Sequence, residues 1–120
     1  MDIILLQGPS GSGKSTIIKR LCKLGKKTLE EKYYESIHHL MSRQGLVSKF
    51  CWIGYWFKSL YTNIESNPDQ IFTDRSPYES AIYAQNGHKI IDAIRTAMEE
   101  ISLEYEVNWI NVYLYAPFEI

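Results

Sequence analysis

Gly8-Pro9-Ser10-Gly11-Ser12-Gly13-Lys14-Ser15-Thr16 fits the phosphate-binding pattern G-x-x-x-x-G-K-[ST]. An apolar run at 3–6 precedes it, and a segment with helical spacing at 17–24 follows it and ends at Gly25. A strand, a glycine-rich loop and a helix in this order form the context in which the pattern indicates a nucleotide-binding loop. The alternative is a Gly/Ser-rich turn that binds nothing.

The residue types of this loop predict how it would hold a nucleoside triphosphate. Its glycines permit backbone angles that are closed to other residues, so successive amides can point at phosphate oxygens, and the helix N-terminus adds positive potential. We expect Lys14, lying at the surface, to reach the β- and γ-phosphates, Ser15 to bind Mg²⁺ and Thr16 to contact the α-phosphate. The predicted ligands are ATP and Mg²⁺, and the predicted ATP-binding residues are Gly8, Pro9, Ser10, Gly11, Ser12, Gly13, Lys14, Ser15 and Thr16.

The composition narrows the class of protein. The chain has 120 residues, of which 45% are hydrophobic and 22% charged, and its formal net charge is −1, so we expect one globular domain over 1–120. This charge predicts neither a nucleic-acid partner nor an anionic membrane partner, and no apolar run reaches the roughly 20 residues that span a bilayer. The first residues do not resemble a signal peptide. Cys22 and Cys51 are expected to be buried free thiols, which predicts a cytoplasmic protein.

The rest of the chain alternates short apolar segments with segments of helical spacing. Strands are expected at 28–29, 70–73 and 107–115, and helices at 34–42, 46–64, 78–83 and 90–101. The segment 107–115 is almost continuously apolar, which is typical of a buried parallel strand. The sequence therefore predicts an α/β, three-layer P-loop fold whose parallel sheet of about four strands is flanked by helices.

The helix at 46–64 carries an apolar stripe with aromatic residues beside it. The stripe consists of Leu46, Phe50, Ile53, Phe57, Leu60 and Ile64. Trp52 and Trp56 lie together off this stripe, and Tyr55 lies nearly opposite to it. Two tryptophans beside a core seam require a further partner. We interpret them as packing against a second helix, with base stacking and a homodimer contact as the alternatives.

Charged residues follow two of the expected strands. Glu30 and Glu31 end the strand at 28–29, and Asp74 and Arg75 directly follow the strand at 70–73. Ligands of parallel sheets bind beyond the carboxyl ends of the strands. An aspartate at such a strand end, downstream of a phosphate loop, is expected to hold Mg²⁺, and Arg75 adds a permanently charged donor. The alternatives are a solvated charge cluster for the two glutamates and a structural ion pair for Asp74 and Arg75.

Together, four motifs resemble the thymidylate kinase and deoxynucleoside kinase group. They are the loop at 8–16, E-E at 30–31, T-D-R-S at 73–76 and Y-L-Y-A-P-F-E at 113–119, and they span nearly the whole chain. The resemblance implies an ATP-dependent phosphotransferase acting on a (deoxy)nucleoside or a nucleoside monophosphate. The roles that it implies are catalysis by Lys14 and Arg75, proton abstraction by Glu30 or Glu31, metal binding by Ser15 and Asp74, and acceptor binding by Trp52, Tyr55, Trp56 and Arg75.

The chain departs from this pattern at its end. In the family, a strand like 107–115 is followed by an arginine-rich lid helix, a fifth strand and a final helix, whereas this sequence stops at Ile120. Lid arginines cover the charge that develops on the transferring phosphate, so we expect slow transfer by this chain alone. The alternatives to a nucleoside or nucleotide kinase are a P-loop kinase of another small metabolite and a nucleotide-binding regulatory module.

Overall fold

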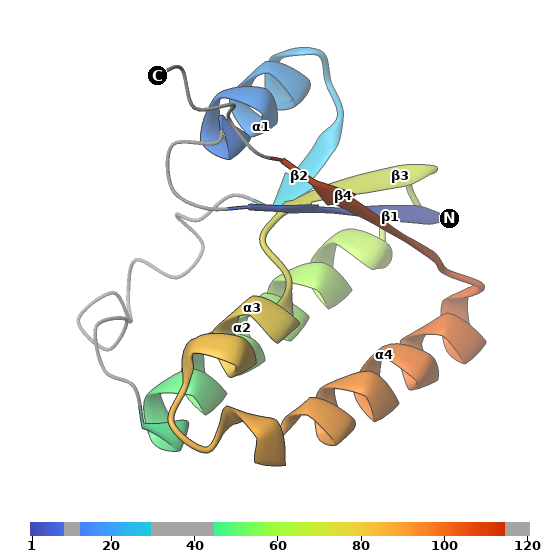
Figure 1. The fold of residues 1–120 in the computed structure, drawn as a ribbon. Helices are drawn as coiled ribbons and strands as arrows, with labels where there is room; N and C mark the ends of the chain where they lie inside the picture. Colours follow the sequence, from blue (N-terminus) through green and yellow to red (C-terminus); the bar gives the residue numbers. More distant parts are fainter. Residues whose placement is uncertain (9–12, 30–44, 115–120) are drawn as a thin grey trace, which may run out of the picture.

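Four parallel strands form one sheet in the order β2-β3-β1-β4 (Figure 1). The computed structural model describes residues 1–8, 13–29 and 45–114, without the side chains of residues 80 and 83. The strands are β1 (Asp2–Gln7), β2 (Lys27–Leu29), β3 (Gln70–Asp74) and β4 (Asn108–Tyr113). The predicted α/β class with a four-stranded parallel sheet is confirmed. The helix expected at 34–42 lies outside the described residues.

The helices lie on both faces of this sheet. They are α1 (Lys14–Lys23), α2 (Leu46–Ile64), α3 (Pro77–Tyr83), the 3₁₀ turn η2 (Gly87–Lys89) and α4 (Ile91–Tyr105). The connection through α1 crosses the sheet in one direction, and the later connections cross it in the other. Because such crossovers are right-handed, opposite directions place the helices on opposite faces. Figure 1 shows this arrangement, with α1 on one face and α2, α3 and α4 on the other.

The side chains of β1 alternate between two hydrophobic clusters. Ile3 and Leu5 belong to the larger cluster, which lies between the sheet and α2, α3 and α4. Ile4 and Leu6 belong to the smaller cluster, which they form with Ile18 of α1. The apolar face predicted for the helix after residue 90 is confirmed, since it buries Ile90, Ile94, Met98 and Ile101.

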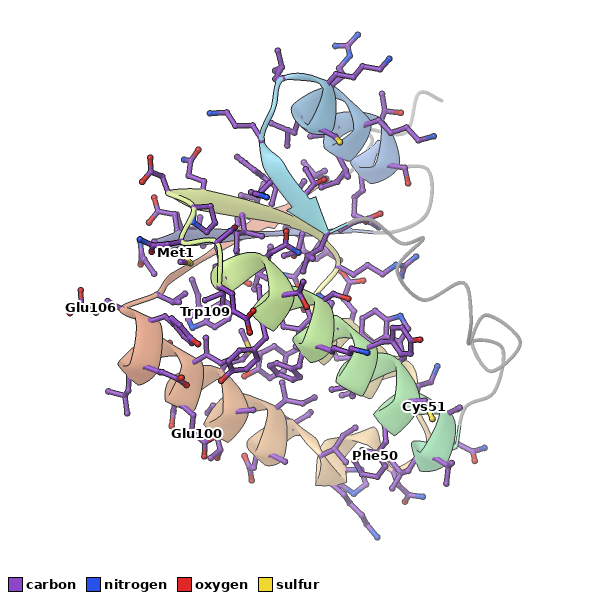
Figure 2. All side chains as sticks on the ribbon, turned by 180° about the vertical axis from the view of Figure 1, so that it is seen from behind. Met1, Phe50, Cys51, Glu100, Glu106 and Trp109 are labelled. Carbon is purple, nitrogen blue, oxygen red and sulfur yellow. The ribbon has the colours of Figure 1, made fainter. Side chains whose placement is uncertain are left out.

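The buried face of α2 is rotated from the predicted stripe toward the tryptophans. Ile53, Leu60 and Ile64 are buried as expected, but Phe50 is 55% exposed. In its place, Lys49, Trp52 and Trp56 complete the buried face in the N-terminal half of the helix. Figure 2 shows Phe50 and Cys51 at the end of α2 that lies far from Met1 and Glu106. The assignment of Phe50 to the core was therefore wrong, because the larger tryptophan rings occupy the face that packs against the sheet and α3.

Two expectations about burial also fail. Within the described part of the chain, β4 pairs only with β1, so it is an edge strand whose residues are half-buried or exposed rather than a buried one. Its Trp109 still packs against the larger cluster and points into the space between the sheet and α4 (Figure 2). Cys22 and Cys51 are free as expected, but Cys22 is exposed and Cys51 is only half-buried.

None of the helices in residues 1–8, 13–29 and 45–114 combines the length and the hydropathy needed to cross a bilayer. The longest of them, α2, has its N-terminal half buried on one face by Trp52 and Trp56 and its C-terminal half by Leu60 and Ile64.

Candidate functional site

The carboxyl ends of β1 and β3 bring the predicted charged residues beside the start of the phosphate loop. These two strands pair directly, and Leu6 is aligned with Asp74. The ladder continues for one further hydrogen bond, from the Arg75 amide to the Leu6 carbonyl oxygen at 2.9 Å. Gly8, which opens the loop, therefore emerges from the sheet beside Arg75. The start of the loop and the Asp74-Arg75 pair therefore lie at the same edge of the sheet.

Lys14 is the first residue of α1 and is folded back over the loop. Its ammonium group donates a hydrogen bond to the carbonyl oxygen of Gly8, and the residue is only 6% exposed. The expectation that Lys14 lies at the surface was therefore wrong, because the side chain reaches back to Gly8 instead of into solvent. Gly13 precedes it with φ 93°, a left-handed conformation that favours glycine, which explains the glycine at this position of the pattern.

Of the other residues in the pattern, only Gly8, Gly13, Ser15 and Thr16 are among those that the structure describes. Ser15 and Thr16 lie in the first turn of α1 with exposed side chains, where a ligand at the helix N-terminus would meet them. Pro9, Ser10, Gly11 and Ser12 lie outside the described residues. Their predicted amide contacts with phosphate stay a prediction.

Asp74 ends β3 on the side of the sheet that α1 covers. Alternation along the strand places it on the same face as Phe72, which packs against Ile4 and Leu6. The residue is only 2% exposed, so its carboxylate is buried on this face of the sheet. A carboxylate together with the Ser15 hydroxyl supplies hard oxygen ligands, which suit Mg²⁺ when water and phosphate oxygens complete its coordination. The donor set on this side of the edge fits the predicted metal.

Arg75 lies one residue further along, at the point where the chain turns from β3 toward α3. Its guanidinium pairs with the carboxylate of Glu79, with Nη1 and Oε2 separated by 3.6 Å. The other carboxylate oxygen of Glu79 accepts a hydrogen bond from the Gly8 amide at 3.4 Å. Glu79 therefore ties the start of the phosphate loop to the arginine and partly neutralises the charge of the guanidinium.

Sequence reasoning missed Glu79 and a second polar link between the strand ends. The side-chain amide of Gln7 donates to Asn111 Oδ1 at 2.8 Å, and its Oε1 accepts from the Ser76 hydroxyl at 3.0 Å. This link joins β4, β1 and the turn after β3. The available signals were the four-residue spacing of Arg75 and Glu79 and the polar Asn111 within an otherwise apolar strand.

The predicted acceptor residues differ in their accessibility. Trp52 is 2% and Trp56 0% exposed, and both belong to the larger cluster, which favours the packing interpretation over base stacking. Trp56 nonetheless reaches the candidate site through its indole N–H, which donates to the Arg75 carbonyl oxygen at 3.3 Å. Tyr55 is half-buried on α2 and packs against the same cluster. Glu30 and Glu31 lie outside the described residues.

Comparisons with family models, curated proteins and solved structures gave no match to this chain. The functional argument therefore depends on the residues and geometry of this edge of the sheet.

Proposed function

We propose that this protein is a P-loop kinase that binds ATP and Mg²⁺ and transfers the γ-phosphoryl group to a nucleoside or a nucleoside monophosphate. The observation that carries this proposal is the pairing of β1 with β3. It joins a phosphate-loop sequence containing Lys14 to the Asp74-Arg75 pair at one edge of a parallel sheet. Ligands of α/β sheets bind at such an edge, where neighbouring connections run in opposite directions.

The two faces of the sheet support a division of roles at this edge. Lys14 and Asp74 lie on the α1 side, where the triphosphate and its metal would bind. Arg75 is held from the other side by Trp56 of α2 and pairs with Glu79 of α3, so we assign it to the acceptor side. In this assignment Lys14 binds the β- and γ-phosphates, and Arg75 orients the acceptor and stabilises the transferring group by its charge. Mg²⁺, when bound, would neutralise phosphate oxygens.

A second candidate is a nucleotide-binding regulatory module. One observation favours it: the Arg75 guanidinium is paired with Glu79, so its positive charge is partly neutralised before any phosphate arrives. Phosphoryl transfer depends strongly on such charge, since an arginine acting on the transferring phosphate is worth roughly 10³ to 10⁵ in rate. A module of this kind would bind ATP in the same loop and transfer its phosphate very slowly.

Titration calorimetry with ATP and Mg²⁺ tests the nucleotide site. We expect Lys14→Ala to abolish ATP binding, because the ammonium would bind the phosphates. The protein should stay folded, because Lys14 belongs to neither hydrophobic cluster. Lys19→Ala is the matched control, since Lys19 is an exposed lysine of the same helix. Equal affinities in the wild type and in Lys14→Ala would contradict the site.

A labelled-phosphate assay over a panel of acceptors separates the two candidates. The panel contains thymidine, thymidylate, the other nucleosides and their monophosphates, and Lys14→Ala serves as the blank. Transfer to one class of acceptor, lost in Arg75→Ala, supports the kinase. ATP binding without transfer to any acceptor would favour the regulatory module, and transfer only to acceptors without a base would favour a kinase of another metabolite.

A further inference from the structure

We propose that Trp56 and Thr73 are positioning residues for Arg75, which they hold in a strained backbone conformation that presents its guanidinium to the acceptor. This inference rests on the proposed function, because it explains how the arginine assigned to the acceptor is oriented. Trp56 was expected to bind the acceptor directly, but Trp56 and Thr73 are both fully buried, so neither side chain is assigned a direct contact with a substrate in the proposed function.

The conformation of Arg75 is unusual for its residue type. Its φ is 93°, in the left-handed region that residues with a Cβ avoid and that glycine favours. Asparagine and aspartate enter this region more readily than arginine does. Such strain persists only where the surrounding structure over-determines it, and it is concentrated at functional sites.

Three hydrogen bonds hold the backbone of Arg75 in this conformation. Its amide donates to Leu6 of β1 at 2.9 Å. Its carbonyl oxygen accepts from the Thr73 hydroxyl at 2.7 Å and from the Trp56 indole N–H at 3.3 Å. Leu6, Thr73 and Trp56 are all buried, so water does not replace these partners. The peptide unit after Arg75 is therefore clamped from two sides.

The clamp sets the direction in which the chain and the guanidinium leave the sheet. Only Ser76 separates Arg75 from Pro77, the first residue of α3, so the chain must turn sharply. The turn brings the side chain of Arg75 to that of Glu79, four residues later, and Glu79 accepts a hydrogen bond from the Gly8 amide. A rotation about φ of Arg75 would carry the guanidinium away from Glu79 and from the start of the phosphate loop. Since the Trp56 ring is fully buried, its effect on a ligand must pass through Arg75.

A double-mutant cycle tests whether Trp56 and Thr73 act on the acceptor through Arg75. Trp56→Phe keeps an aromatic ring in the cluster and removes the N–H, and Thr73→Val replaces the hydroxyl with a methyl group of similar volume. Each loses one hydrogen bond, so we expect each to weaken the binding of the preferred acceptor, thymidine or thymidylate, by about three- to tenfold. Binding of ATP and Mg²⁺ should stay unchanged. In an Arg75→Ala background, neither substitution should weaken acceptor binding any further.

Trp109→Phe is the matched control for the loss of an indole N–H. Trp109 packs against the same cluster, and its N–H donates to the Ser102 hydroxyl at 2.5 Å, far along the chain from Arg75. We expect it to lower the thermal stability as Trp56→Phe does, and to leave acceptor binding unchanged. If Trp109→Phe weakens acceptor binding equally, the effect of Trp56 is one of general stability and the proposal is wrong.

Nuclear magnetic resonance of the Arg75 side chain provides a readout that needs no ligand. Trp56→Phe and Thr73→Val should shift its Nε–H resonance, identified by its absence in Arg75→Ala, whereas Trp109→Phe should not. An unmoved resonance in both variants would overturn the inference even if ATP binds normally. Absence of ATP binding in the wild type would instead contradict the proposed function, so the two failures are distinguishable.

Discussion

The two faces of the sheet differ in how much they bury and in what they present to a ligand. On the face of α2, α3 and α4, a large cluster contains residues from Ile3 to Ile101, among them both buried tryptophans. On the face of α1, the described residues form a small cluster around Ile4, Leu6 and Ile18. Lys14 and Asp74, which are assigned to the triphosphate and its metal, belong to the smaller face. The larger face contributes the backbone clamp on Arg75 and, from α3, the Glu79 carboxylate that pairs with its guanidinium.

This difference suggests that stability and triphosphate binding are separated across the sheet. Burial of apolar area is the dominant favourable term in folding, so the larger face should provide most of the stability. The smaller face has fewer buried side chains to lose and lies against the phosphate loop. Strand β1 belongs to both faces, because its consecutive side chains alternate between them. Substitutions along this strand therefore compare the two faces directly.

The largest effect is expected from a matched pair of substitutions in β1. Leu5 and Leu6 are neighbours with 1% and 4% exposure, and they point into the larger and the smaller cluster. Leu→Ala substitutions at buried sites cost about 2–5 kcal/mol. We expect Leu5→Ala to fall near the top of this range and Leu6→Ala near the bottom, as measured by urea unfolding.

In a titration with ATP and Mg²⁺, Leu6→Ala should have the larger effect and Leu5→Ala the smaller one. The Leu6 side chain packs against Ile18 of α1, the helix that begins at Lys14, so its truncation should weaken ATP binding more than that of Leu5. Both titrations are made under conditions where each variant is folded. Equal effects on stability and on ATP binding would show that the two faces are not separated in this way.

A second prediction concerns the close approach of η2 to α3 on the larger face. A Cβ atom at Gly87 would lie 1.7 Å from the carbonyl oxygen of Ala81, so the backbone must move to accept any side chain. We expect Gly87→Ala to destabilise the protein by about 1–3 kcal/mol, as overpacking does, and to leave ATP affinity unchanged. Thermal unfolding measures the first effect. Gly54→Ala is the control, because a Cβ at that exposed helical glycine would meet nothing within 4 Å.

The third prediction compares Asp74 with Arg75 across the edge. Asp74→Asn removes one of the charged oxygens offered to Mg²⁺, so ATP affinity should depend less on Mg²⁺, with a loss of about tenfold (~1.4 kcal/mol) at saturating metal. Arg75→Ala should keep the dependence, since Arg75 is assigned to the acceptor. A magnesium titration of ATP binding measures both variants. The same metal dependence in Asp74→Asn and in the wild type would mean that Asp74 has a structural role.

The smallest effect is expected at high pH, in the contact between α2 and α4. Burial raises the pKa of Tyr61, and the Glu104 carboxylate, which accepts its hydroxyl at 3.1 Å, raises this pKa further. A raised pKa means that the folded state holds the proton more tightly than the unfolded one. The stability from the neutral phenol is therefore complete below the ordinary value of 10.0 and is lost as the pH rises above it.

Urea unfolding between neutral pH and the alkaline range measures this loss. Tyr61→Phe should have a shallower decline in stability above the ordinary tyrosine pKa than the wild type has. Tyr113→Phe, which removes the hydroxyl of a tyrosine 69% exposed on β4, is the control and should follow the wild type. Parallel curves for Tyr61→Phe and the wild type would remove Tyr61 as the source of the decline.

Much of the fold followed from local patterns in the sequence. The apolar runs of β1 and β3 are short and bounded by polar residues, and the face of α4 repeats with helical spacing, so each was predictable. The buried side of α2 was not predictable, because two adjacent apolar stripes run along this helix and the sequence does not indicate which of them packs against the sheet. Phe50 and Trp52 are both apolar, and packing against α3 and β3 selected the tryptophan.

The candidate site was predictable in its charged residues and not in their conformation. Lys14, Asp74 and Arg75 are identified by motif and by strand ends. The left-handed φ of Arg75 has no signal in the sequence, since nothing marks an arginine for this conformation. Glu79 was missed because its pairing with Arg75 requires the turn after β3 to be very short. The conformation of Arg75 depends on contacts with Leu6 and Trp56, which are distant in the chain, whereas the pairing of Glu79 depends on the local path of the turn.

The position of β1 in the middle of the sheet has a consequence for the order of folding. Its partners are aligned through Asp2 with Gln70 on one side and with Asn108 on the other, so both of its ladders close large loops. Chains dominated by such distant pairings fold slowly, because the entropy of loop closure is lost before the contacts form. During synthesis β1 emerges before β3 and β4, yet it gains both of its neighbours only when those strands arrive. The start of the phosphate loop is thus made well before the strands that hold it in place, so ATP binding should appear late in refolding.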